Sequence, residues 1–190
     1  MSKKKIILTS LALVATTLLV LIGVVAMQPA EFNIVRTATI SGPPDAVFEQ
    51  VNDFHKWETW SPWEKLDLDM KKTYDGSPLG TGATYAWNGN EKVGEGKMTI
   101  TDSRPNERIR IKLEFLKPFQ ATNDTEFKFK ADGGKTIVTW SMSGTNNFTA
   151  KAFSLMMDMD KMVGGDFEKG LAAMKETVEK KETVEKKDDK

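Results

Sequence analysis

The sequence lacks cysteine entirely and contains a single histidine, His55. These shortages exclude disulfide frameworks, iron–sulfur clusters, thiol catalysis and any metal site that needs two imidazoles. Neither sign of charge is in excess, since 27 Lys and Arg residues balance 27 Asp and Glu residues. Without a net basic field, the chain is a poor match for a nucleic-acid backbone. We therefore expect no metal, no other cofactor and no nucleic-acid partner.

Charge is also missing from one long stretch near the N-terminus, Ile6 to Met27. A helix that crosses the hydrocarbon core of a bilayer needs about 20 predominantly apolar residues, and this stretch is long enough. The basic run Lys3–Lys5 precedes it, and the positive-inside rule keeps such an end in the cytoplasm. We predict a single-pass membrane protein with an extracytoplasmic domain, divided as residues 1–5 (cytoplasmic N-terminus), 6–27 (transmembrane anchor), 28–31 (short connector), 32–178 (folded domain) and 179–190 (charged tail).

The same stretch leaves a second interpretation open. Val24 and Ala26 have the small-residue spacing of a signal-peptide cleavage site, and a basic start fits a signal peptide as well. The apolar core of a signal peptide usually runs for only about 7 to 15 residues, which favours the retained anchor. If cleavage does occur, the protein is secreted or periplasmic instead.

The residues after the apolar stretch change to strand and helix patterns. The β-branched run Phe32–Ile40 predicts a first strand, and Asp45–Val51 predicts a short helix. From Lys71 to Ser143, apolar and polar residues alternate with a period of two, most clearly in Arg108–Phe115. Turn residues divide this region into about six runs. The alternation predicts an antiparallel meander with one buried and one wet face.

From Phe148 onward the apolar period becomes helical. A helical projection places Phe153, Met156 and Asp160 on one stripe with later apolar residues such as Phe167, so we expect a long amphipathic C-terminal helix. A carboxylate in that stripe is costly unless it is paired or wetted.

Arg36 is a possible partner for Asp160, because it shares strand parity with the apolar residues of Phe32–Ile40. The alternative is a helix that begins later, or kinks at Gly164 and Gly165, and turns Asp160 to solvent.

Four segments carry a resemblance to a known family: Gly42–Phe48, Val51–Trp57, Trp60–Trp63 and Gly165–Leu171. With these segments, residues 32–178 resemble the START-like, or SRPBCC, superfamily, in particular its membrane-anchored members of polyketide cyclase/dehydrase type. The resemblance implies an α+β helix-grip fold, in which a curved antiparallel sheet surrounds the long C-terminal helix. It also implies a deep cavity for apolar small molecules between sheet and helix. It transfers no catalytic residue, because catalytic residues differ between branches of the superfamily.

Large aromatic and methionine side chains are the candidates for the wall of such a cavity, because tryptophan suits pocket walls and methionine adapts to several ligand shapes. The candidate ligand-binding residues are Trp57, Trp60, Trp63, Tyr85, Trp87, Trp140, Met142 and Met156, with Arg36 and Asp160 as polar anchors.

Three classes of function follow from these observations. The first is a membrane-anchored domain that binds an apolar small molecule or a lipid. The second is an enzyme of cyclase or dehydratase type that uses His55 or Asp160 as acid or base. The third is a protein-interaction domain that uses the curved sheet. The first class is favoured, because only His55 and Asp160 support the enzyme, whereas many large apolar side chains suit a ligand-binding wall.

Overall fold

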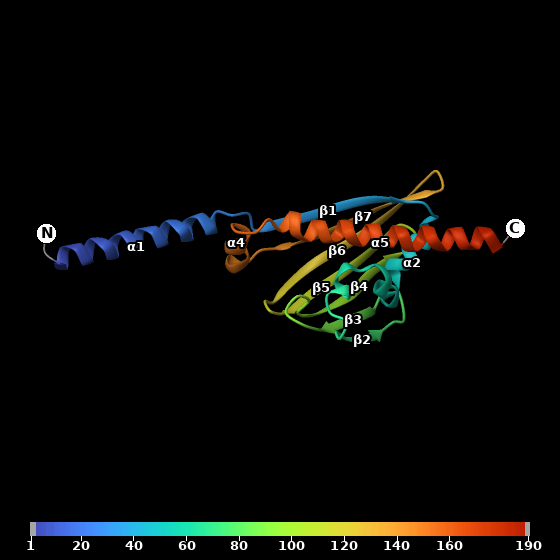
Figure 1. Cartoon of the computed structure of the whole chain (residues 1–190), viewed down its shortest axis with the longest axis horizontal. Coiled ribbons are helices and arrows are strands. Elements are labelled where there is room, and N and C mark those ends of the chain that lie inside the picture. The colour runs from blue at the N-terminus through green and yellow to red at the C-terminus, as the bar shows by residue number, and fades with distance from the viewer. Residues whose placement is uncertain (1–2, 189–190) are drawn as a thin grey trace. The chain divides into compact units, whose positions relative to one another are not determined.

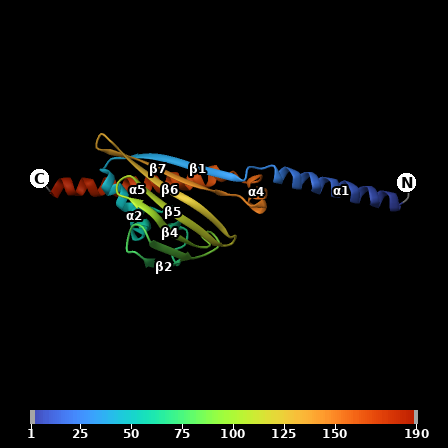
Figure 2. The same ribbon diagram turned by 180° about the vertical axis from the view of Figure 1, so that it is seen from behind.

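The computed structural model describes residues 3–188, with side chains through residue 183. The chain divides into two compact units. The N-terminal unit consists of Met1–Phe32 and Thr145–Met159, and the sheet unit consists of Asn33–Gly144 and Asp160–Lys190. Figures 1 and 2 show the elements of both units from opposite sides.

The sheet unit contains a seven-stranded sheet in the order β1-β7-β6-β5-β4-β3-β2. Strands β2 to β7 form an antiparallel meander, in which each strand pairs with the next along the chain. Helix α5 lies over β1 and β7 (Figure 1). The predicted α+β helix-grip fold is confirmed, with strands β1 (Glu31–Ile40), β2 (Lys71–Gly76), β3 (Ala83–Asn88), β4 (Glu95–Arg104), β5 (Arg108–Lys117), β6 (Ala121–Asp132) and β7 (Lys135–Thr145), and with α5 (Met159–Asp188).

The period-two pattern determines which face of the sheet is covered. In β5, Ile109 and Ile111 are fully buried, whereas Arg110 between them is exposed. We call the buried side, against which α5 packs, the inner face. It contains the apolar residues that the alternation predicted, because successive side chains of a strand point to opposite sides of the sheet.

The chain between β1 and β2 forms short helices that cover part of the sheet: α2 (Pro44–Asn52), η1 (Phe54–Lys56), α3 (Trp57–Trp60) and η2 (Pro62–Lys65). The two tryptophans of α3 are held by the end of α2. The Trp57 indole Nε1 donates to the Val51 carbonyl at 3.1 Å, and the Trp60 Nε1 donates to the Gln50 carbonyl at 2.9 Å. The last carbonyls of a helix have no partner within it, so these bonds satisfy both the helix end and the buried indoles.

The C-terminal region departs from the prediction of one continuous helix from Phe148. Helix α4 (Phe148–Ser154) ends early, the chain turns through the next four residues, and α5 begins at Met159. This break shifts the helical register, so Met156 and Asp160 do not share a buried stripe with Phe167. Asp160 lies in the first turn of α5, with 62% of its side chain exposed. The alternative expectation, a helix that begins later, describes the structure.

The N-terminal unit contains α1 (Lys3–Ala26) and α4. Among the described residues, α1 is one helix that is long and apolar enough to cross a membrane, and none of its most apolar stretch is buried. By length and composition it fits a transmembrane segment or a signal sequence. Helix α4 lies beside the C-terminal end of α1, where the Lys151 Nζ donates to the Ala26 carbonyl at 3.3 Å.

Candidate ligand-binding site

Five aromatic rings fill the space between the inner face and α5. Trp140 of β7 is at the centre: its ring stacks on Phe167 of α5, with centroids 4.0 Å apart and planes 7° apart, and on Phe127 of β6 at 4.7 Å. Trp57 and Trp60 meet Trp140 edge-on. All five side chains are buried. We call this group the Trp140 cluster. It fixes α5 on the sheet, since stacked and edge-to-face pairs add to the free energy of burying apolar area.

Gly170 permits this close approach of helix and sheet. A Cβ atom at Gly170 would lie 2.9 Å from Cζ3 of Trp140. Any larger residue would therefore push α5 away from the ring of Trp140.

Within and beside the Trp140 cluster, two polar atoms are buried without a hydrogen-bond partner: the Trp140 Nε1 and the Thr125 Oγ1. Both residues point to the inner face from adjacent strands, because Trp140 pairs with Phe127 and Met142 pairs with Thr125 in the β6–β7 register. Thr125 is therefore the diagonal neighbour of Trp140. A buried donor or hydroxyl without a partner costs about 1 to 3 kcal/mol, so proteins seldom retain two together.

Three of the other four tryptophans donate from the indole to a backbone carbonyl. The indole of Trp87 donates to the Val93 carbonyl at 3.0 Å, and those of Trp57 and Trp60 bind the end of α2. Trp140 is thus a tryptophan whose ring is fully packed and whose N–H has no hydrogen-bond partner among the described residues. Sequence reasoning identified Trp140 as a candidate but missed Thr125, whose only signal is its inward parity in β6.

Arg36 of β1 links the sheet to the first turns of α5. Its guanidinium donates to both carboxylate oxygens of Asp160, at 2.9 and 3.1 Å, and to the Asp160 carbonyl at 3.0 Å. Its remaining bonds go to Glu168 at 2.7 Å and to the carbonyl of Val35 at 2.9 Å. Arginine has five N–H donors, so protein acceptors occupy all of them.

The hydrogen bond from Arg36 lowers the pKa of Asp160, and the two carboxylates raise the pKa of Arg36. Gly164 provides the space for the guanidinium, because a Cβ there would overlap the Arg36 Nη2 at 2.0 Å. The structure therefore forms the pair of Arg36 and Asp160 that strand parity suggested, at the surface rather than in the interior. Its geometry is that of a clamp on α5.

A second polar cluster lies between η2 and the β2–β3 hairpin. The Tyr85 hydroxyl donates to Glu64 at 2.8 Å, and the Lys72 Nζ donates to the other oxygen of Glu64 at 2.9 Å and to Glu58. Burial raises the pKa of Tyr85, and the hydrogen bond to Glu64 raises it further. Only 9% of the Glu64 side chain is exposed. Each of its carboxylate oxygens accepts a hydrogen bond from β2 or β3, so the cluster fastens η2 to the sheet.

The remaining predicted residues are dispersed. Trp63 packs edge-on against Trp140 and Phe167. Met142 is buried beside Trp140 on β7, whereas Met156 is 85% exposed in the turn between α4 and α5 and belongs to the N-terminal unit. Whether these residues touch a ligand stays a prediction.

His55 lies at the surface, with 59% of its side chain exposed. Its Nδ1 is 2.9 Å from the Asp53 carboxylate, and its ring stacks on Tyr74 with centroids 4.0 Å apart. Asp53 and Tyr74 thus hold the imidazole in place.

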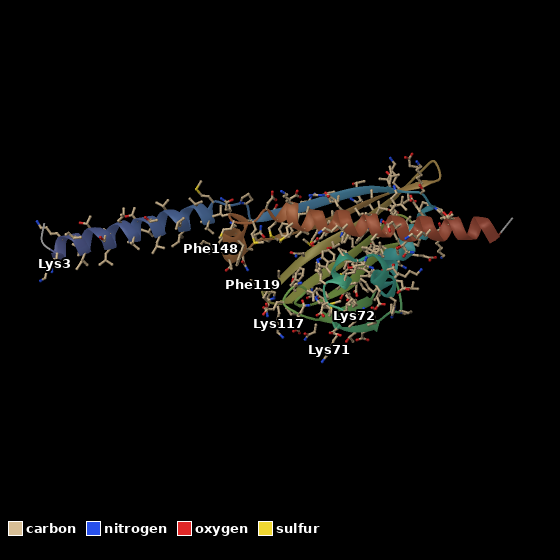
Figure 3. All side chains as sticks on the ribbon, in the orientation of Figure 1. Lys3, Lys71, Lys72, Lys117, Phe119 and Phe148 are labelled. Atoms are coloured by element: carbon tan, nitrogen blue, oxygen red, sulfur yellow. The ribbon has the colours of Figure 1, made fainter. Side chains whose placement is uncertain are left out.

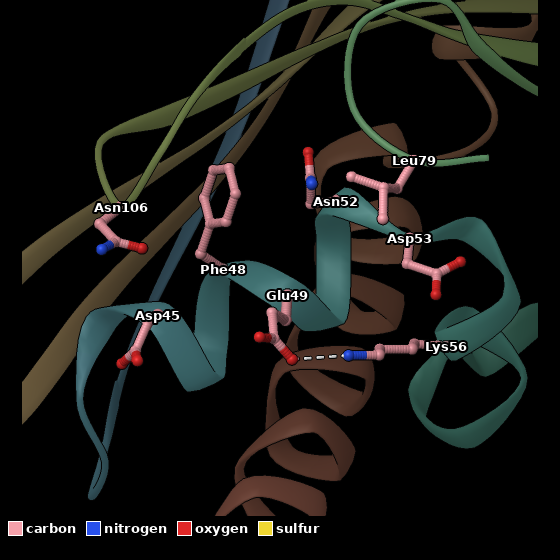
Figure 4. A pocket seen from close by; sticks show the side chains of 8 residues that line it. All are labelled: Asp45, Phe48, Glu49, Asn52, Asp53, Lys56, Leu79 and Asn106. Carbon is pink, nitrogen blue, oxygen red and sulfur yellow. Dashed lines mark hydrogen bonds and ion pairs between the residues drawn. The ribbon is translucent and has the colours of Figure 1, made fainter. Parts of the chain in front are cut away.

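An open pocket of about 420 Å³ lies beside α2 (Figure 4). Three carboxylates contribute to its wall, and the Lys56 Nζ pairs with one of them, Glu49, at 2.7 Å. The wall contains none of the residues predicted to bind a ligand. The lining residues are Asp45, Phe48, Glu49, Asn52, Asp53, Lys56, Leu79 and Asn106.

Comparison with known proteins agrees with this architecture. The family model described as "Polyketide cyclase / dehydrase and lipid transport" matches residues 31–179. No curated protein matches the chain. Among solved structures, protein CV1439 from Chromobacterium violaceum has a TM-score of 0.57 at 13% identity, covering 77% of this chain and 96% of its own.

Two further structures show the same fold. An uncharacterised protein from Rhizobium leguminosarum has a TM-score of 0.57 at 16% identity, covering 79% of this chain and 95% of its own. Ara h 8.0201 has a TM-score of 0.54 at 14% identity, covering 78% of this chain and 97% of its own. The family model spans the whole sheet and most of α5, so the chain belongs to the polyketide cyclase/dehydrase and lipid transport family, with the START-like fold of the SRPBCC superfamily.

Proposed function

We propose that this protein binds an apolar small molecule or lipid, which carries one polar group, on the inner face beside the Trp140 cluster. The observation that carries the proposal is the pair of buried, unpartnered polar atoms, Trp140 Nε1 and Thr125 Oγ1. A carbonyl or hydroxyl oxygen of a ligand would accept from the indole. The Thr125 hydroxyl can donate or accept, so it would bind the same polar group.

The surroundings of these two atoms favour an apolar body for the ligand. Met142 and Ile111 are the inner-face neighbours of Thr125 on the adjacent strands, and both are buried. Ligand sites of this kind are mostly apolar, with a few polar groups that fix the orientation. The family's description, which includes lipid transport, supports the same class of ligand.

The proposal includes membrane attachment through α1. Three lysines precede the apolar stretch, and its C-terminal end leads into the folded part within a few residues. We infer that the N-terminus is cytoplasmic and that the sheet unit lies outside the cytoplasm. A reporter enzyme fused after Lys190 should be active only outside the cytoplasm, and the chain should stay in the membrane pellet after a high-salt wash. Cytoplasmic activity would contradict the orientation.

Catalysis by His55 or Asp160 has less support. Both side chains are mostly exposed, and Asp160 is bound to Arg36. An acid or base that faces water is not placed to act on a molecule held against the inner face.

The test of ligand binding uses the full chain in mild detergent. Extraction and mass spectrometry should identify a co-purified apolar compound, and the protein should bind that compound again after its removal. Thr125→Val should lower its affinity by roughly tenfold, which corresponds to the loss of one hydrogen bond. Thr122→Val is the matched control, because Thr122 lies on the same strand with an exposed side chain. A protein that yields no compound and binds none of a broad apolar panel would refute the proposal.

A further inference from the structure

Helix α4, the turn that follows it and the first residue of α5 expose several large apolar side chains. Met156 is 85% exposed, and Phe148 is 51% exposed. Contiguous exposed apolar patches in soluble domains mark sites of contact with a protein or a membrane. We call this group the α4 patch, and its members are Phe148, Phe153, Leu155, Met156, Met157 and Met159.

The α4 patch belongs to the same compact unit as α1. Lys151, in the middle of α4, donates from its Nζ to the Ala26 carbonyl, the last residue of α1. The backbone N–H of Asn146 donates to the Ala30 carbonyl at 2.6 Å, just after the end of α1. Figure 3 shows Lys3 at one end of α1 and Phe148 on α4, beside its other end. The patch is therefore fastened to the point where the apolar helix ends.

The composition of this segment suits the boundary between lipid headgroups and acyl chains. Between Phe148 and Met159 the charged residues are Lys151 and Asp158, and the Lys151 ammonium is bound to α1. Phenylalanine, leucine and methionine side chains on a short helix bury themselves readily at this depth. Because the segment has little charge, its binding to a membrane would depend on the burial of apolar side chains rather than on attraction to anionic lipids.

We propose that the α4 patch is a second membrane contact, which inserts Phe148, Leu155, Met156 and Met157 into the leaflet from which α1 emerges. This inference rests on the proposed function of α1 as a membrane anchor. It commits the patch to the lipid bilayer, because the patch continues directly from the end of the helix that enters the lipid.

The segment that carries the α4 patch lies, along the chain, between two elements of the proposed ligand-binding face. Strand β7, which carries Trp140, ends at Thr145, and α5, which carries Phe167, begins at Met159. The membrane-inserted segment is thus the covalent link between the two elements that hold the ligand-binding face.

The test uses the absence of cysteine, which allows one fluorophore to be placed at a chosen residue. The full chain is labelled with a polarity-sensitive dye at Met156→Cys or Phe148→Cys and reconstituted in phosphatidylcholine vesicles. Leu13→Cys in α1 is the control for the anchor. Ser77→Cys, in the exposed turn between β2 and β3, is the control for water. Vesicles with lipids that carry a quencher at a shallow or a deep acyl position measure the depth of each dye.

We expect shallow quenchers to reduce emission at positions 148 and 156 at least twofold, deep quenchers to act most strongly at position 13, and neither to act at position 77. Quenching at position 13 together with emission at 156 equal to that at 77 would overturn the second contact and leave the anchor intact. Absence of quenching at position 13 would overturn both. Energy transfer between copies labelled at 156, without lipid quenching, would assign the patch to a second copy of the chain and refute the proposal.

Discussion

Replacing Thr125 by valine should make the unliganded protein more stable and, at the same time, a weaker binder. Thr125 is 5% exposed, and its Oγ1 has no hydrogen-bond partner. Valine has nearly the same shape, so the substitution removes the hydroxyl without opening a cavity. A buried polar group without a partner costs about 1 to 3 kcal/mol in protein mutational data. We therefore expect the free energy of unfolding to rise by about 1 to 2 kcal/mol.

The assay is thermal unfolding of the delipidated full chain in mild detergent, with tryptophan emission as the signal that monitors unfolding. For a chain of this size, each kcal/mol shifts the melting temperature by about 2 to 4 °C, so the expected increase is about 2 to 8 °C. Thr122→Val should stay within about 0.5 kcal/mol of the natural protein, as for most surface substitutions.

The opposite signs of the two effects separate a ligand-binding hydroxyl from a structural one. A structural hydroxyl has a partner within the fold, so its removal lowers stability whether or not ligand is present. Destabilisation of the delipidated protein by Thr125→Val of 1 kcal/mol or more would refute the reasoning. Unchanged affinity combined with increased stability would place the ligand away from Thr125.

Two further predictions concern the clamp on α5 and the behaviour in acid. Gly165→Ala should raise stability by up to about 1 kcal/mol, because nothing lies within 4 Å of a Cβ there and alanine favours a helix. Gly164→Ala should lower the melting temperature relative to Gly165→Ala, because the new Cβ displaces the guanidinium of Arg36. In an Arg36→Ala background the two alanine variants should melt at the same temperature. A difference that persists in that background would contradict the clamp. Hydrogen bonds from Arg36 and Lys72 lower the pKa of Asp160 and of Glu58 from their ordinary values of 3.8 and 4.5. These carboxylates stabilise the fold fully above their pKa values in the unfolded chain, and they lose that contribution as pH falls through their pKa values in the folded protein. The melting temperature should therefore be level from pH 7 to about 5 and decrease at lower pH. An increase in melting temperature below about pH 4 would contradict this sign.

Local patterns in the sequence were enough to predict the strands, the short helix α2 and the apolar helix α1. A strand alternates because its side chains point to opposite faces, and this period is visible in any short window of residues. Ile109 and Ile111 therefore identified the inner face without knowledge of the partner strands. Arg36 shares the parity of that face, and its pairing with Asp160 was one of the two alternatives that the sequence left open.

The tertiary structure determined the helix break and the hydrogen-bond partners, which the local periodicity of the sequence does not encode. The helical projection continued through Leu155–Asp158, but the backbone turns there, and a break of a few residues rotates every later side chain to a new face. Whether Trp140 and Thr125 have hydrogen-bond partners depends on the strand register and on α5, which no local window of residues contains. The same holds for Glu64, whose partners Lys72 and Tyr85 come from two strands. The sequence alone therefore determined which strand residues face inward, whereas the contacts between distant segments determined which inward polar groups have no hydrogen-bond partner.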